Sequence, residues 1–167
     1  CRLTDMQEQG ELPLRVTHND TNINNVLFDE ATHQPLVVID LDTVMPGTML
    51  YDFGDGVRAG CSTAKEDEPD LSKVDFDIAL FRAFAAGFLK GMEGSVTAAE
   101  RSLMPAAARL MTFECGMRFL TDYLSGDTYF KTAYAEHNLV RARTQFRLVE
   151  RMESLAAEMA AAVAESV

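Results

Sequence analysis

The hydrophobic periodicity of this 167-residue chain changes once, near residue 72, and that change constrains the fold more than any other feature. Upstream, two short β-rich runs at residues 25–28 and 36–39 flank a segment of turn composition, which predicts a β-hairpin with a longer loop. Downstream, apolar residues recur at the spacing of helices. We therefore expect an α+β chain that is mostly α, with a small β-hairpin region followed by helices.

Three helical regions are predicted in the second part of the chain. The first covers residues 74–92, because Phe76, Leu80, Phe84 and Phe88 recur at helical spacing. Thr97 and Glu100 form a capping-box pattern that opens a helical region to about residue 124, in which Pro105 should force a break. A last helix is expected at about residues 139–164. The glycine-rich residues 43–71 are expected to be irregular, with room for one helical turn.

Composition excludes several classes of function. The formal net charge of −11 argues against non-specific nucleic-acid binding, which depends on Lys and Arg neutralising phosphates. The strongest acidic run, at residues 66–70, is expected to be a solvated loop. No apolar run reaches the roughly 18 residues of a membrane span, so a membrane is not an expected partner either. The three cysteines, Cys1, Cys61 and Cys115, lack the pairing of a disulfide framework or zinc site, which favours a reducing, cytoplasmic setting.

The candidate chemistry lies in His18-x-Asp20-x4-Asn25 and in Asp40, which follows the second β-rich run. The loop that carries Asp20 enters the first strand at Asn25, and the hairpin returns the chain so that Asp40 ends the second strand beside Asn25. Amide and carboxylate oxygens are ligands that suit Mg²⁺. Asp20 is then free to accept a proton from an attacking hydroxyl, which is the division of roles that phosphoryl transfer requires.

These residues resemble a known family. His18-x-Asp20-x4-Asn25 and Ile39-Asp40 are similar to the catalytic loop and metal-binding aspartate of the protein-kinase-like superfamily, in the branch of aminoglycoside phosphotransferases and choline kinases. Longer strings, at residues 18–28, 39–47 and 142–149, resemble bacterial N-acetylhexosamine kinases. The resemblance implies the C-terminal lobe of a protein-kinase-like fold. It also implies Mg²⁺-dependent transfer of a phosphoryl group from ATP to a small-molecule hydroxyl, here the anomeric hydroxyl of an N-acetylhexosamine.

The resemblance assigns roles to individual residues. Asp20 would be the catalytic base, and Asn25 and Asp40 would be the Mg²⁺ ligands. Asp42 would be either a ligand of a second metal ion or a residue that supports the first site, and both interpretations stay open. His18 would be structural, because its usual role in this loop is to hold the backbone.

Asp52-Phe53-Gly54 spells the metal-binding tripeptide of protein kinases. Asp40, however, directly ends the hairpin strand, so the hairpin geometry selects Asp40 as the metal ligand. Asp52 is expected to have a structural role, as a residue that caps or braces the catalytic loop.

The residues that would hold the acceptor are Arg118 and Tyr129, because the resemblance places sugar binding in this region. A second interpretation stays open for Arg118. Glu114 and Asp122 lie four residues before and after it, so it could form only ion pairs on the surface of a helix.

No glycine-rich loop and no strand lysine for the ATP phosphates precede His18. We therefore expect residues 1–167 to form one C-terminal catalytic lobe from which the N-terminal, nucleotide-clamping lobe is absent. Such a lobe should be inactive alone, and the face that meets the missing lobe should favour self-association.

Three alternatives remain. The acceptor could be choline, an aminoglycoside or another amino alcohol. The chain could be a non-catalytic binding or interaction lobe. Finally, Asp40-x-Asp42 imitates the nucleophile motif of phosphatases of the haloacid-dehalogenase type, although that fold requires a parallel sheet and helices are predicted here instead.

Overall fold

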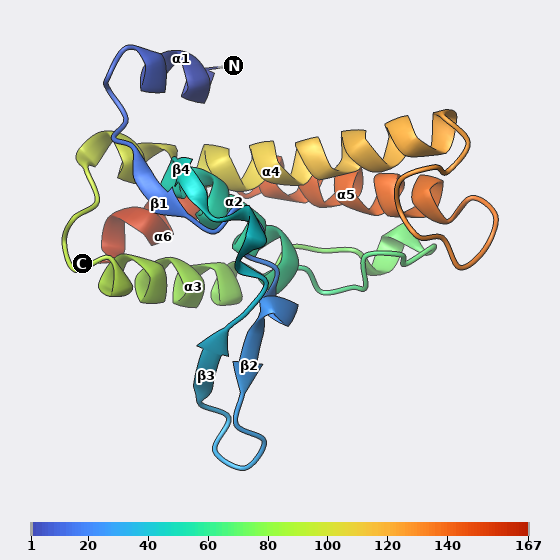
Figure 1. The fold of residues 1–167 in the computed structure, drawn as a ribbon, viewed down its shortest axis with the longest axis horizontal. Coiled ribbons are helices and arrows are strands. Elements are labelled where there is room, and N and C mark those ends of the chain that lie inside the picture. Colours follow the sequence, from blue (N-terminus) through green and yellow to red (C-terminus); the bar gives the residue numbers. More distant parts are fainter. Residues whose placement is uncertain (1, 167) are drawn as a thin grey trace.

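The computed structural model describes residues 2–166, so Cys1 lies outside the described residues. It is an α+β structure that is mostly helical, which confirms the predicted fold class (Figure 1). The helices are α1 (Arg2–Glu8), α2 (Met49–Gly60), α3 (Ile78–Gly91), α4 (Ala98–Leu124), α5 (His137–Ser154) and α6 (Ala156–Glu165). The strands are β1 (Arg15–Thr17), β2 (Val26–Phe28), β3 (Pro35–Val38) and β4 (Met45–Gly47), and single 3₁₀ turns lie at η1 (Ile23–Asn25), η2 (Leu41–Thr43) and η3 (Leu71–Lys73). No helix within residues 2–166 combines the length and the hydropathy that a membrane span needs.

The four strands form two nested antiparallel pairs. β1 pairs with β4, and β2 pairs with β3. The chain thus leaves the outer pair at β1, forms the β2–β3 hairpin and returns to the outer pair at β4. As a result, the segment between β1 and β2 lies opposite the segment between β3 and β4. The hairpin, which projects from the helical body in Figure 1, confirms the predicted one to within one residue at each strand end.

Helix α2 corrects the expectation that residues 43–71 are irregular. It has 12 residues, and the Thr48 hydroxyl at its N-terminus accepts a hydrogen bond from the Leu50 amide. Leu50, Phe53 and Val57 recur at helical spacing and are fully buried in the core. Because β4 leads directly into this helix, the first turn of α2 lies next to the loops that join the two strand pairs.

The glycines of α2 suggested a loop, but two of them mark close packing between helices. An added Cβ on Gly54 would lie 2.6 Å from the carbonyl oxygen of Ala107 in α4. An added Cβ on Gly56 would lie 2.6 Å from the ring of Phe84 in α3. The sequence shows where the glycines are, but not which neighbouring helices need the space that a side chain would fill. For this reason the helix was not predicted.

Helix α4 begins at the predicted capping box of Thr97 and Glu100. The predicted break at Pro105 is wrong, because the helix runs through this residue to Leu124. Proline removes the amide donor that would otherwise bond the carbonyl of Arg101. However, α4 packs against α2, α5 and α6, and burial of an amphipathic helix provides most of the stability of helices in proteins. The tertiary packing therefore outweighs one lost hydrogen bond.

The helices on either side of α4 also differ from the prediction. The last helix, predicted as one element at 139–164, divides into α5 and α6 because the backbone at Leu155 adopts φ −102° and ψ 12°. This break lets α5 pack along α4 while α6 packs against α3 as well. Helix α3 begins after Asp77, whose carboxylate accepts two amide hydrogen bonds, and its buried stripe contains Phe81 rather than the exposed Leu80.

We expect Gly54→Ala to destabilise the protein. The new methyl group would meet backbone atoms of α4 that cannot move without separating two core helices, and such overpacking typically costs about 1–3 kcal/mol. The free energy of unfolding in urea would measure this change.

Gly60→Ala is the matched control in the same helix, because an added Cβ there meets nothing within 4 Å. It should leave stability unchanged or raise it by up to about 1 kcal/mol through helix propensity. Equal stabilities for the two variants would contradict the packing role of Gly54.

Candidate functional site

The two loops that face each other between the strand pairs are joined by direct hydrogen bonds. The Thr43 hydroxyl donates to the carbonyl oxygen of His18 at 2.6 Å, and the Asn19 side-chain amide donates to the carbonyl oxygen of Thr43 at 3.1 Å. Asn19 itself adopts a left-handed conformation with φ 63°. These contacts hold the loop that carries Asp20 against the segment that carries Asp40 and Asp42.

Asp52, in the first turn of α2, holds the same loop from below. Its two carboxylate oxygens accept hydrogen bonds from the backbone amides of His18 at 2.8 Å and Asn19 at 2.7 Å. The Thr21 hydroxyl donates to the backbone carbonyl of Asp52 at 2.6 Å. Three hydrogen bonds therefore connect the loop around Asp20 to a helix whose core face is fully buried.

The hairpin brings Asn25 and Asp40 next to each other. The Ile39 amide donates to the Asn25 carbonyl at 2.9 Å, and the Asn25 side-chain amide donates to the carbonyl oxygen of Asp20 at 3.0 Å. The second bond turns the amide oxygen of Asn25 away from the loop. His18 contributes a ring contact of 3.0 Å between its Nε2 and the carbonyl oxygen of Ile39.

Carboxylates crowd around Asp40. Asp40 has a left-handed backbone with φ 62° and precedes the turn η2, which contains Asp42. The hydrogen bond and the charge of Asp42 raise the pKa of Asp40, and the charge of Asp20 raises it further. Carboxyl groups that repel each other in this way are stabilised as anions by a nearby cation.

This donor set fits Mg²⁺, which binds through one or two protein oxygens and keeps several waters. Asn25 could supply its amide oxygen, and Asp40 could supply a carboxylate oxygen. Asp42 is adjacent to Asp40, so the structure leaves its direct or supporting role open. Within residues 2–166, no three His, Cys, Asp or Glu side chains converge as a complete metal-binding cluster, so any ion here would depend on these few oxygens and on its other ligands.

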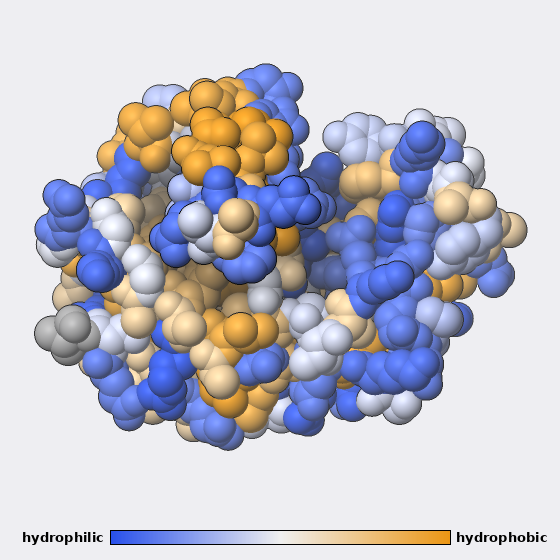
Figure 2. All heavy atoms as spheres, turned by 90° about the horizontal axis from the view of Figure 1, so that it is seen from below, coloured by the Kyte–Doolittle hydropathy of each residue, from blue (hydrophilic) through white to orange (hydrophobic). Residues whose placement is uncertain are grey.

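A pocket of about 550 Å³ lies beside Asp20 and contains both predicted acceptor residues, Arg118 and Tyr129. Seen from the side of the hairpin, the surface is hollowed between the hairpin and the end of the molecule where α4 and α5 meet the long loops (Figure 2). The walls come from the loop of Asp20, from α2, α4 and α5, and from the segment after α4. The lining residues missed by the sequence analysis include Asp55, Arg58, Glu66, Glu114, Cys115, Lys131 and Arg141.

Ion pairs neutralise one wall of this pocket. Arg58, whose side chain is only 10% exposed, contacts Asp55 at 2.9 Å and Glu66 at 3.1 Å. Arg141 lies 3.6 Å from the other oxygen of Glu66. Burial lowers the pKa of Arg58, but the interactions with Cys115, Asp55 and Glu66 outweigh it and raise the pKa. Cys115 is not a reactive thiol, because burial raises its pKa to about 11.

The acidic run, predicted to be a solvated loop, is instead fixed against α5. Glu66 pairs with the two arginines, and Asp67 lies 3.3 Å from Nε2 of His137. The hydroxyl of Thr144 donates to the carbonyl oxygen of Glu68 at 3.1 Å. Charge composition could not reveal the contacts with α5, because those partners lie about 75 residues away in the sequence.

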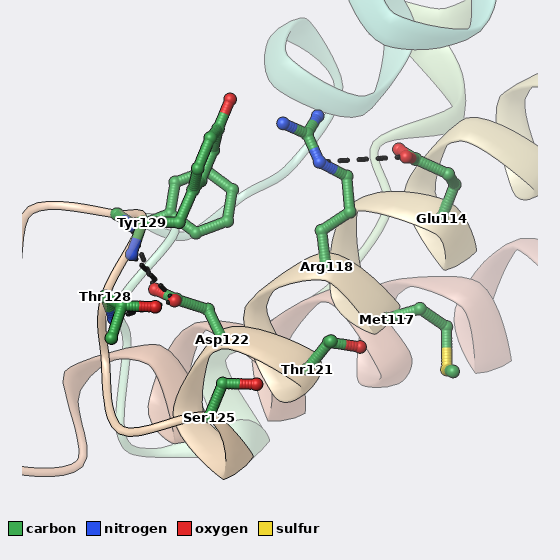
Figure 3. Close-up of a pocket in the computed structure, with 9 residues that line it drawn as sticks. Glu114, Met117, Arg118, Thr121, Asp122, Ser125, Thr128 and Tyr129 are labelled. Atoms are coloured by element: carbon green, nitrogen blue, oxygen red, sulfur yellow. Dashed lines mark hydrogen bonds and ion pairs between the residues drawn. The ribbon is translucent and has the colours of Figure 1, made fainter.

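Asp122 holds the loop that carries Tyr129, as Figure 3 shows. This buried carboxylate accepts backbone hydrogen bonds from Thr128 at 2.9 Å, Tyr129 at 2.8 Å and Phe130 at 2.9 Å, and a side-chain bond from Asn138 at 2.9 Å. Burial raises the pKa of Asp122, but these donors outweigh it and hold the pKa below its usual range. Asp122 therefore anchors the loop that presents Tyr129, and it does not serve as an ion-pair partner of Arg118.

Of the two helix-surface ion pairs that the sequence allows for Arg118, the structure shows the one with Glu114. Its Nε lies 3.7 Å from Glu114, and both side chains are about half exposed. Its guanidinium carbon lies 5.8 Å from the ring centroid of Tyr129 and 5.3 Å from that of Phe130. Figure 3 shows Arg118 and Tyr129 extending to the same side of α4. The structure thus brings Asp20, Arg118 and Tyr129 to one pocket from three separate segments.

Comparison with known families adds one finding. A model of the phosphotransferase enzyme family matches residues 2–93, which is more than half of the chain. The matched part contains both strand pairs, the loop of Asp20 and helices α2 and α3. Together with the element order, the match agrees with the C-terminal lobe of a kinase-like fold.

We expect Asp122→Asn to destabilise the protein at neutral pH by about 1–3 kcal/mol, because an amide nitrogen would face backbone N–H groups that lose their acceptor. A carboxylate with a lowered pKa stabilises the fold above its unfolded pKa of about 3.9, and this contribution is lost as pH falls through the folded pKa. The difference between wild type and variant should therefore shrink below about pH 4.

Urea unfolding at pH 7 and near pH 3 would measure this difference. Glu114→Gln is the control, because its exposed ion pair with Arg118 should be worth less than about 1 kcal/mol. A stability difference between wild type and Asp122→Asn that does not change with pH would contradict the anchoring role.

Proposed function

The chain belongs to the phosphotransferase enzyme family, and from this premise we propose that it is the catalytic lobe of an ATP-dependent kinase for the hydroxyl of a small molecule. The observation that carries the proposal is the shared pocket of Asp20, Arg118 and Tyr129. A base next to a pocket of about 550 Å³ can meet an acceptor of the size of a sugar, since small-molecule sites span about 300–1,000 Å³.

In the proposed reaction, Asp20 orients the acceptor hydroxyl and receives its proton. The acceptor oxygen forms a bond to the γ-phosphorus, the bond from this phosphorus to the bridging oxygen breaks, and ADP leaves. Because such transfer depends mainly on positioning, the rigid attachment of the loop to Asp52 and Thr43 supports this role for Asp20.

Asn25 and Asp40 are the residues that would hold Mg²⁺, with Asp42 beside them. When bound, the ion would neutralise charge on the β- and γ-phosphate oxygens. The donor set and the carboxylate crowding around Asp40 support this assignment over Asp52, whose two oxygens are both occupied by backbone amides.

We further propose a neutral sugar, the anomeric hydroxyl of an N-acetylhexosamine, as the acceptor. Choline and other ammonium compounds bind best against open aromatic faces. Here a cation already lies near each ring: the guanidinium carbon of Arg118 is 5.8 Å from the ring centroid of Tyr129 and 5.3 Å from that of Phe130, and Arg141 lies 5.3 Å from the ring centroid of Phe119. The pocket acids Asp55 and Glu66 are paired with arginines, so a cationic acceptor would compete with cations already in place.

A second lobe would complete the site. The hairpin beside Asp40 exposes apolar side chains on both strands, including Leu27, Leu36 and Val37, and hydrophobic surface lies beside its polar tip in Figure 2. A two-stranded hairpin is marginally stable alone, and exposed apolar surface of this kind usually meets a partner. We propose that a nucleotide-clamping lobe outside residues 1–167 covers this face.

The alternatives have less support. A haloacid-dehalogenase-type phosphatase requires a parallel sheet, whereas both strand pairs within residues 2–166 are antiparallel. A binding module without catalysis would not need the loop of Asp20 to be fixed by contacts from both α2 and η2.

We expect Asp20→Asn in the full-length protein to lower kcat for sugar phosphorylation by about two to four orders of magnitude, the usual effect of losing a general base. Binding of ATP should survive, because Asp20 is not one of the proposed Mg²⁺ ligands. Coupled ADP-release kinetics would measure kcat, and calorimetry would measure ATP affinity.

Asp70→Asn is the control for a lost carboxylate, because Asp70 is exposed and bonds only to its own turn, and it should leave kcat unchanged. Near-normal turnover of Asp20→Asn would contradict the base assignment. The isolated chain is expected to show no turnover, since positioning by the second lobe is lost.

A Mg²⁺ titration should distinguish the role of Asp40 from that of Asp52. We expect Asp40→Ala to raise the Mg²⁺ concentration for half-maximal activity by at least about tenfold. This is the lower end of the loss of affinity that follows when a residue that supports a metal site is removed. Asp52→Ala should instead lower stability by about 1–3 kcal/mol, because the amides of His18 and Asn19 lose their acceptor. A shifted Mg²⁺ requirement for Asp52→Ala alone would reverse the assignment.

A further inference from the structure

A second pocket, of about 470 Å³, adjoins the acceptor pocket on the outer side of α4. The two pockets share Glu114, Arg118, Tyr129 and Phe130 in their linings, so these side chains form a common wall. Figure 3 looks into this outer pocket, with Arg118 and Tyr129 on either side of it. The remaining lining comes from the last turns of α4 and the loop behind it: Met117, Thr121, Asp122, Ser125 and Thr128.

The outer pocket exposes little charge that is free of a partner. Asp122 is buried and fully used by donors from its own loop and from α5, and Glu114 lies within ion-pair distance of Arg118. The hydroxyls of Thr121 and Ser125, by contrast, have no side-chain hydrogen-bond partner in the described part of the chain. The pocket therefore offers free hydroxyl groups beside the thioether of Met117.

An aromatic ring completes this surface. Tyr129 is 74% exposed and stands at the boundary between the two pockets. A ring next to hydroxyl groups and apolar atoms is complementary to a sugar unit, which presents C–H groups on one face and hydroxyls at its edge. A charged ligand would find only the Glu114–Arg118 pair as exposed charge in this lining.

We propose that the outer pocket is an extension of the acceptor site that binds a second glycosyl unit. The inference rests on the proposed sugar-kinase function. The reacting sugar would occupy the inner pocket at Asp20, and a glycosyl substituent would pass the wall of Arg118 and Tyr129 and lie against Met117 and Thr121. The enzyme would then act on disaccharides whose reducing-end N-acetylhexosamine has a free anomeric hydroxyl.

Binding to the full-length protein in the absence of ATP tests the inference without turnover, because residues of this chain form both pockets. Isothermal titration would compare N-acetylglucosamine with its derivatives that carry galactose at C3 or at C4. We expect at least one disaccharide to bind about tenfold more tightly than the monosaccharide, equivalent to about 1.4 kcal/mol. Met117→Trp should abolish this gain by filling the outer pocket and should leave the affinity for the monosaccharide unchanged.

Phe113→Trp is the matched control, because Phe113 is also half-exposed on α4 but lines neither pocket, and it should keep the disaccharide gain. If the monosaccharide binds and no disaccharide binds more tightly, the extension is wrong and the proposed function stands. A gain that survives Met117→Trp also contradicts the extension. If neither sugar binds, the sugar site itself fails, and the extension fails with it.

Discussion

The pair of hydrogen bonds from the amides of His18 and Asn19 to Asp52 is the interaction on which the candidate site depends. Without it, the loop that carries Asp20 would keep a single side-chain bond to α2, from Thr21, and its contacts with Asn25 and with the η2 segment around Thr43. Asp52 itself is fixed because Phe53 and Leu50, in the same turn of α2, are fully buried. The hydrophobic core thus positions the loop that carries Asp20 through one carboxylate.

The tripeptide Asp52-Phe53-Gly54 has a packing explanation in this chain. Asp52 faces the loop, Phe53 makes ring contacts with α3, and Gly54 allows α4 to approach closely. Each of the three residue types therefore fits a different neighbour. The tripeptide has the sequence of a metal-binding motif, but it lies in a helix and not at the end of the hairpin strand. A motif therefore predicts chemistry only together with the element that carries it.

Local sequence predicted what local contacts determine. Residues close in sequence determine the hairpin, the adjacency of Asn25 and Asp40 and the cap at Thr97. Turn composition and capping patterns were therefore sufficient to predict these features. Helix α2 packs against the distant α4, and Glu66 pairs with the distant Arg141 as well as with Arg58, so local patterns carry only part of that information. The family resemblance alone pointed to Arg118 and Tyr129, which line one pocket with Asp20, and their role as acceptor residues stays a prediction.

The distribution of charge divides the site into two parts. In the acceptor pocket, acids are largely matched by arginines, so a neutral ligand can enter without leaving a charge unpaired. Around Asp20, Asp40 and Asp42 the carboxylates repel one another, as the raised pKa of Asp40 indicates. A chain with a net charge of −11 therefore concentrates uncompensated negative charge at the place where a metal–nucleotide complex would bring cations, and it keeps the place for the acceptor close to neutral. Under the proposed function, this contrast would draw the metal ion to the carboxylates and leave the pocket to a neutral acceptor.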